Sequence, residues 1–284
     1  MSTRNNEERL GAAQIHSDSP ITQPSQDLLN FVVPTMFVEL PSKGQFYPEN
    51  HPLHNEETIE IRFMTAKDED TLNSPTLIKQ GVVLDRLIQS LILSPNIRSE
   101  DLLIGDKNAI LIEARISGYG SGYEVKVACP SCGEEQEQEF DLEECRSVYN
   151  GFEDGFEGIK LLESGTFLVK LPKTQVECEF RLLMGHDEKH LMAKRKKGKL
   201  KKKDQDLSIT KQTELMIVSL NGEPDPAMIS YFAENMPVQD ARYLRKAYEK
   251  VNPTTNLSTE FECESCGYTE DMEVPLSVGF FWPK

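Results

Sequence analysis

Two short cysteine motifs are the residues of this chain whose types and spacing predict chemistry. Cys129-Pro-Ser-Cys132-Gly and Cys263-Glu-Ser-Cys266-Gly both have Ser before the second cysteine and Gly after it. Extended-looking sequence precedes both motifs, and both carry Glu at the eleventh position and Leu at the fourteenth. A Cys-x-x-Cys-Gly knuckle turns the chain sharply enough for two thiolates to reach one tetrahedral Zn²⁺. The pair of knuckles therefore predicts one four-cysteine zinc site made by Cys129, Cys132, Cys263 and Cys266.

Two other interpretations of these cysteines stay open at this point, a redox dithiol and a knuckle without metal. A thioredoxin-like Cys-x-x-Cys stands at the start of a helix after a strand, whereas acidic, strand-like sequence follows both pairs here. A site closed by four thiolates has no open coordination position, so it builds structure and does not hydrolyse a substrate. Cys145 and Cys178 have no partner at ligand spacing and are expected to be core or half-buried cysteines.

The remaining candidate motifs favour structural roles. His186 and His190 have the spacing of helical metal ligands, but Asp187 stands where a metalloprotease motif needs Glu, and we interpret the segment as a solvated helix end. The glycines of 118–122 follow an expected helix and precede an expected strand, which indicates a helix stop and hinge, not a phosphate loop. Because nothing pairs a nucleophile with a base, the sequence predicts that the protein is not an enzyme.

These motifs have to be positioned by a mixed fold. The predicted class is α+β, with zinc-ribbon-like paired knuckles, a long mixed α/β insertion and an N-terminal β and helical part. We expect a disordered polar arm at 1–27, a β and helical region at 28–122, and a zinc-ribbon-like core at 123–284 that carries an inserted segment, 143–255. The intervening stretch 133–262 has 130 residues. Closing so long a loop costs roughly a few kcal/mol, whereas structural zinc contributes on the order of 10 kcal/mol.

The expected elements follow the apolar pattern. Thr65 is a candidate cap for a short acidic helix, and Pro237 for a later helix. The three consecutive aromatic residues of Gly279–Lys284 either pack on the core of the chain or anchor an interface. Strands are predicted in 31–40, 57–64, 123–128, 134–142 and, as a hairpin, 159–183; helices are predicted over 76–93, 99–117, 185–193, 208–220, 226–235 and 238–250.

Charge limits the class of partner. The 284 residues include 31 basic and 47 acidic ones, for a net charge of −16, although eight basic residues crowd into 194–203. An acidic body argues against general binding of nucleic acid or membranes, and no stretch has the roughly 20 apolar residues of a membrane span. The basic run predicts a loop at 194–206 that is solvated or contacts an acidic partner. It has no aromatic residue on which a base could stack.

Three stretches resemble a phage family: PTMFVELPSKGQFYP, then DLLIGDKNAILIEARISGYGSGYEVKVACPSCG, then the second CESCG. Over roughly residues 30–280 the chain is similar to the baseplate hub and hub-assembly proteins of T-even-like contractile-tailed phages. The resemblance implies a late virion protein that acts by binding other hub or tail proteins, and leaves a homo-oligomer open. Its expected location is the tail baseplate of the virion, or the host cytoplasm during assembly. Some members of the family lack the cysteines, so zinc is not essential to the shared role.

Two alternative functions remain at this stage. One is a tail assembly chaperone that is absent from the mature virion. The other is a nucleic-acid-associated zinc-ribbon protein that uses Lys194–Lys203 as its contact. Salt-sensitive DNA binding that depends on these basic residues would favour the second alternative.

Overall fold

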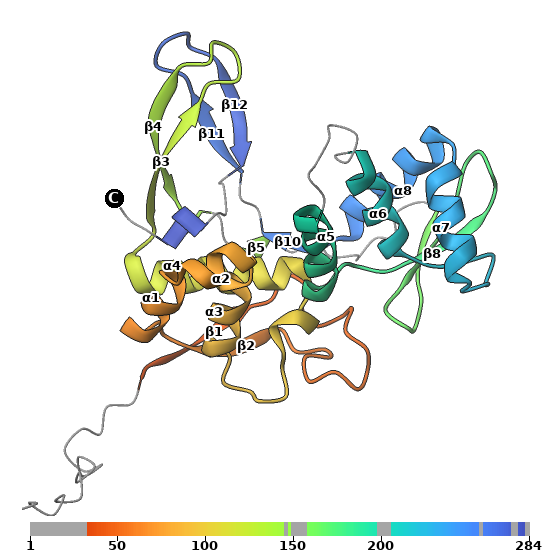
Figure 1. Cartoon of the computed structure of the whole chain (residues 1–284), viewed down its shortest axis with the longest axis horizontal. Helices are drawn as coiled ribbons and strands as arrows, with labels where there is room; N and C mark the ends of the chain where they lie inside the picture. Colours follow the sequence, from red (N-terminus) through yellow and green to blue (C-terminus); the bar gives the residue numbers. More distant parts are fainter. Residues whose placement is uncertain are drawn as a thin grey trace, which may run out of the picture. The chain divides into compact units, whose positions relative to one another are not determined.

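The fold is described here from a computed structural model (Figure 1), which describes residues 33–144, 147–148, 158–197, 206–255, 258–273 and 278–281. The described residues from Pro34 onward belong to one compact unit. The expected mixture of helices and small antiparallel sheets is confirmed. The predicted arm at 1–27, Cys145 and Trp282 lie outside the described residues. Within the described residues, no helix has the length and apolar character that crossing a membrane requires.

The first elements are a two-stranded sheet and three short helices. Strands β1 (Thr35–Glu39) and β2 (Thr58–Arg62) pair antiparallel, and α1 (Ala66–Leu72) begins at the predicted cap, where Thr65 and Asp68 form a capping box. The helix predicted over 76–93 is instead two helices, α2 (Pro75–Gln80) and α3 (Val83–Leu91). Gly81 separates them because its φ of 67° ends α2 in a left-handed cap.

Helix α4 (Ile104–Tyr119) is the central helix of the N-terminal part. The sequence predicted a helix from residue 99, but a single 3-10 turn, η2 (Ser99–Asp101), comes first. Gly120, with φ 85°, ends α4, which agrees with the interpretation of 118–122 as a helix stop. Nine of the sixteen residues of α4 are buried, including Asp106 and Arg115, so this helix carries polar groups into the core.

The chain between the two knuckles contains a four-stranded antiparallel sheet in the order β6-β7-β8-β9. The predicted hairpin corresponds to β7 (Phe167–Lys170) and β8 (Glu177–Phe180), and β6 (Ile159–Leu161) adds to its edge. The helix predicted over 208–220 ends early. Its last four residues form β9 (Ile217–Leu220), an aliphatic strand that pairs with β8 and is largely buried.

Helices flank this sheet in sequence. They are α5 (Gly185–Lys197), α6 (Asp206–Met216), α7 (Pro226–Asn235) and α8 (Val238–Val251), and the last two match the predicted spans closely. Since α5 continues through Lys197 and α6 begins at Asp206, the predicted basic loop at 194–206 is too long. Its first four basic residues are helical, and 198–205 lie outside the described residues. A small pair, β5 (Ser147–Val148) and β10 (Thr254–Thr255), completes this region.

Two of the three C-terminal aromatic residues are described, and both pack on the protein's own core. Phe280 and Phe281 of η4 (Val278–Phe281) are buried, and the Phe280 ring lies 5.1 Å from the ring of Tyr123. Arg115 of α4 holds this segment in place. Its Nε donates to the carbonyl of Phe280 at 2.9 Å, and its two terminal nitrogens donate to the carbonyls of Gly120 and Gly122.

Two stretches far apart in sequence make the same arginine–aspartate contact. Arg62, at the end of β2, binds both carboxylate oxygens of Asp68, and Asp68 accepts from the N–H of Thr65 at the start of α1. Arg181 follows β8 and binds Asp187 in the same way, and Asp187 accepts from the N–H of Met184 at the start of α5. The two sequences, IRFMTAKDE and FRLLMGHDE, share Arg and Asp-Glu at equal spacing.

A second shared contact extends this correspondence. Strand β1 reads within TMFVELPS and β7 within TFLVKLPKT. The loop after the first Leu-Pro donates from Ser42 N and Oγ to Asp106, and the loop after the second donates from Lys173 N, Thr174 N and Thr174 Oγ1 to Asp240. Asp106 and Asp240 are each the third residue of their helix. We therefore call 35–142 the first repeat and 166–273 the second repeat.

Candidate metal centre

The two knuckles are the turns of two β-hairpins. Strands β3 (Gly122–Ala128) and β4 (Glu135–Asp141) form the first hairpin, and β11 (Ser258–Glu262) and β12 (Thr269–Glu273) form the second. Each repeat contributes one of them at the same place, because Cys129 comes 23 residues after Asp106 and Cys263 comes 23 residues after Asp240. Figure 1 shows the two hairpins side by side.

The backbone of the two turns is the same. In the first, Cys129 N donates to the carbonyl of Glu134, and Gly133 N donates to the carbonyl of Cys129. In the second, Cys263 N donates to Tyr268, and Gly267 N donates to Cys263. Gly133 and Gly267 have φ of 76° and 67°, and a Cβ on either would meet nothing within 4 Å. Glycine is required there by the left-handed backbone and not by lack of space.

The four predicted ligands come together in the structure. All four sulfur atoms lie within 4.8 Å of one another. Cys129 Sγ is 3.8 Å from Cys266 Sγ, and Cys132 Sγ is 3.7 Å from Cys263 Sγ, so both of these short separations join one hairpin to the other. Four thiolates at about 2.3 Å from a tetrahedral Zn²⁺ would be about 3.8 Å apart, so this donor set fits zinc.

The electrostatics of the cluster also fit a bound cation. The N–H of Cys132 donates to the sulfur of Cys129 and lowers its pKa to about 7. The N–H of Glu134 likewise favours the thiolate of Cys132, but desolvation and the three neighbouring thiols outweigh it and raise that pKa to about 12. Four thiols this close together cannot all ionise without a positive charge between them, and a divalent ion supplies that charge.

Outside the sulfur cluster, one side chain joins the hairpins. The amide of Gln136 on β4 donates from Nε2 to the carbonyl of Glu262 at 2.8 Å, and its Oε1 accepts from the N–H of Glu264 at 3.0 Å. Gln136 therefore occupies the donor and acceptor places that a neighbouring strand would fill beside the second knuckle. Sequence reasoning missed this residue, because a glutamine in an acidic strand carries no signal of its partner.

The hairpins are strongly acidic. Residues 122–144 contain eight acidic residues and one lysine, and residues 258–273 contain six acidic residues and no basic one. The buried apolar residues of the hairpins include Val127 and Phe261. Like charges on paired strands repel, so a further bond between the hairpins would stabilise this arrangement.

The other candidate residues lie apart from the sulfur cluster. His186 and His190 are on α5, where the ring Nδ1 of His186 lies 3.2 Å from the carbonyl of Glu100 and His190 is exposed. His186 is at the start of the helix, whereas His190 lies within it, because α5 continues to Lys197. Cys178 is buried in β8, where desolvation raises its pKa to about 12. Among the described residues, no other group of three or more His, Cys, Asp or Glu side chains gathers as a potential metal site.

Comparison with family models places the first part of the chain in a known context. Residues 33–161 match a family model described as T4 bacteriophage base plate protein, which confirms the resemblance to T4-like baseplate proteins. The matched range includes β1, β2, α4 and the first knuckle hairpin, whereas the second hairpin lies beyond it. No curated protein and no solved structure matches the chain.

Proposed function

From the family match over 33–161 and the geometry of the two hairpins, we propose that this protein is a structural component or assembly factor of the baseplate hub of a contractile phage tail. It acts by binding other hub or tail proteins and not by catalysing a reaction. The family match carries the baseplate role, and the hub is the finer assignment that the sequence resemblance adds.

We propose that Cys129, Cys132, Cys263 and Cys266 hold one structural Zn²⁺. The support is the separation of the sulfurs across the two hairpins, 3.7 and 3.8 Å, together with the fully thiol donor set. Zinc bound there supplies a cross-link and leaves no coordination position for a substrate. The residues around it orient the ligands through backbone N–H groups, and Gln136 ties the hairpins beside it.

The zinc cross-link would join the ends of the two repeats. Each hairpin has only two strands, and two-stranded hairpins are marginally stable alone in water. The cross-link therefore holds a docking surface in one shape. The acidic strands of that surface suit a basic partner surface, and they disfavour the alternative of a nucleic-acid-associated zinc-ribbon protein.

Mass spectrometry of purified virions tests the role. A structural subunit is found in intact particles at a fixed ratio to other baseplate proteins. If the chain is abundant in infected cells but missing from finished particles, it is the tail assembly chaperone and not a virion component. A third result, binding to DNA that weakens with salt and disappears when Lys194–Lys203 are neutralised, would favour the nucleic-acid alternative.

A further inference from the structure

Strands β1 and β7 hold equivalent positions in the two repeats, but their outer edges differ. In the second repeat β6 covers the edge, with Lys160 opposite Leu168. In the first repeat β1 pairs with β2 alone among the described strands. Phe37 corresponds to Leu168, since each is the third residue of the shared TMFV and TFLV segments.

The backbone of Phe37 faces this uncovered edge. Leu40 N donates to Glu57 O, and Phe63 N donates to Pro34 O, so the even-numbered residues of β1 bond to β2. The N–H and C=O of Phe37 therefore point away from β2. No hydrogen-bond partner for them is found within the described part of the chain, and the side chain of Phe37 is 68% exposed.

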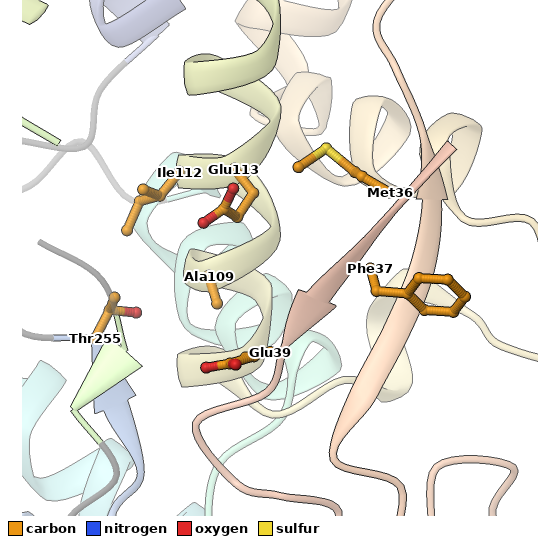
Figure 2. Close-up of a pocket in the computed structure, with 7 residues that line it drawn as sticks. All are labelled: Met36, Phe37, Glu39, Ala109, Ile112, Glu113 and Thr255. Atoms are coloured by element: carbon orange, nitrogen blue, oxygen red, sulfur yellow. The ribbon is translucent and has the colours of Figure 1, made fainter. Parts of the chain in front are cut away.

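A cavity of about 290 Å³ lies beside this edge, between β1 and α4 (Figure 2). Phe37 and Glu39 line it from β1, Ala109 and Glu113 from α4, and Thr255 from β10. In the second repeat the corresponding space is occupied by β6. Tyr243 stands three residues after Asp240, as Ala109 stands three after Asp106, and a Cβ on Gly158, just before β6, would lie 3.1 Å from the Tyr243 hydroxyl.

Thr255 is an independent sign that something binds in the cavity. The residue is only 4% exposed, and its Oγ1 is buried with no hydrogen-bond partner. Buried hydroxyls are normally satisfied, so an unpaired one that lines a cavity points to a polar group that arrives with a ligand. An extended peptide backbone supplies such groups along its whole length.

We propose that the cavity beside β1 is a docking site for an extended segment of a partner baseplate protein. The segment adds to β1 antiparallel, as β6 adds to β7, with its backbone bonding to Phe37. The pattern of β6, Ile159-Lys160-Leu161, indicates an apolar–basic–apolar segment. Glu39 stands where the second repeat has Lys170, so the two strands differ in charge at this position. The identity of the partner as a baseplate protein rests on the proposed function; the strand-accepting edge does not.

The test uses the full chain and a capped synthetic peptide, Gly-Ile-Lys-Leu-Leu, which has the sequence of residues 158–162. We expect the peptide at millimolar concentration to slow hydrogen exchange of the Phe37 amide at least tenfold, measured by NMR. The matched control peptide is N-methylated at its lysine. It has the same side chains but cannot donate that backbone hydrogen bond, and it should give no protection. Equal protection by both peptides, or by neither, overturns the proposal.

A variant of the protein tests the same edge by removing the backbone N–H of Phe37. Phe37→Pro removes an N–H that β2 does not use, and proline is tolerated at such edge positions, so the melting temperature should stay close to that of the wild type. This variant should no longer bind the peptide, whereas Phe37→Leu, which installs the residue of the second repeat, should bind it. If Phe37→Pro fails to fold, the comparison of the unmethylated and methylated peptides on the wild-type protein still tests the proposal.

A separate measurement tests whether the bound segment comes from another protein or from a second copy of this chain. Sedimentation of the wild type should show no self-association through this edge. Self-association that the peptide disrupts would replace the partner by a second copy of the chain and overturn that part of the proposal. Absence of the chain from virions would remove the proposed function while leaving Phe37 protection by the peptide intact, so the two failures are distinguishable.

Discussion

Asp106 and Asp240 perform the same task in two helices that are more than a hundred residues apart. Each is the third residue of its helix, is fully buried, and accepts hydrogen bonds from the loop that follows a Leu-Pro pair. Their surroundings differ. Burial raises the pKa of Asp106, whereas three donors from Lys173 and Thr174 outweigh burial at Asp240 and lower its pKa.

Metal content tests the sulfur cluster. The purified wild-type chain should contain close to one zinc per molecule by elemental analysis, and Cys132→Ser should lose most of it, because three thiolates remain from a closed set of four. The loss should also lower the melting temperature, since binding energy of a structural zinc is folding energy. Cys178→Ala is the matched control, because Cys178 is buried in β8 away from the cluster, and should keep the zinc. Zinc far below one per wild-type chain would contradict the proposed site.

The arginine–aspartate pairs should matter for stability. Arg181→Met leaves the carboxylate of Asp187, which is 2% exposed, without its bidentate partner, and should destabilise the fold by about 3–5 kcal/mol. Urea unfolding measures this change. Arg98→Met is the comparison, because Arg98 pairs with Glu100 while 67% exposed, and should cost less than about 1 kcal/mol. Equal effects of the two substitutions would show that the buried pair has no special weight.

Acid should destabilise the protein through its paired carboxylates. Burial alone would raise the pKa of Asp187, but hydrogen bonds from Arg181 and the N–H of Met184 lower it. The unfolded chain, with an aspartate pKa of about 3.9, then takes up the proton first, so the stabilisation is present above that pH and is lost as pH falls through the folded pKa. In the wild-type protein the free energy of unfolding should fall as the pH is lowered from about 5 to about 2. Asp187→Asn should make this fall less steep, by up to about 1.4 kcal/mol per pH unit, as measured by urea unfolding.

Asp106 should affect the pH dependence of the free energy of unfolding in the opposite direction. Because burial raises the pKa of its carboxyl, the folded state holds that proton more tightly than the unfolded chain does. Its contribution is therefore present below the unfolded pKa and is lost as pH rises through the folded value. Asp106→Asn should remove this loss of stability with rising pH. An Asp106→Asn variant that became more acid-tolerant than the wild type would contradict the assignment.

Arg115 should anchor the C-terminal aromatic residues. Arg115→Met leaves the carbonyls of Phe280, Gly120 and Gly122 without their donor. The cost is about 1–3 kcal/mol for the buried carbonyl of Phe280, whereas water can replace the donor at the exposed Gly120 and Gly122. Chymotrypsin should then cleave at Phe280 and Phe281 faster than in the wild type. Arg115→Lys keeps the charge and restores at most part of this protection, because an ammonium cannot reproduce the planar geometry of three donors. Unchanged cleavage in Arg115→Met would mean that ring packing alone holds the segment.

Elements whose conformation depends on a few adjacent residues were predicted correctly from the sequence. Thr65 marked the start of α1, and the two Cys-x-x-Cys-Gly motifs marked both hairpin turns, since each depends on a few adjacent residues. The single helix predicted over 76–93 was wrong because apolar residues continue across Gly81, whose left-handed backbone is decided by one position. Ile217–Leu220 was predicted helical because an aliphatic run fits either state, and pairing with β8 selects the strand.

Contacts between distant residues were not predictable from one pattern. Gln136 contacts Glu262, 126 positions later in the chain, and a glutamine in an acidic strand gives no sign of that partner. The two repeats did leave a signal, because Arg and Asp-Glu recur at equal spacing in 62–69 and 181–188, and comparison of the chain with itself beyond the cysteines would have found it. The open edge of β1 becomes visible only when β6 is seen beside β7.

The charge of the two hairpins has a consequence of its own. A polyanion such as DNA or RNA meets a strongly negative potential on approaching the strands that carry the cysteines, and each acidic side chain adds to the energetic cost of contact. Repulsion therefore selects among binding partners without any contact with the rejected ones. In the presence of nucleic acid, this end of the molecule would remain available to cationic proteins.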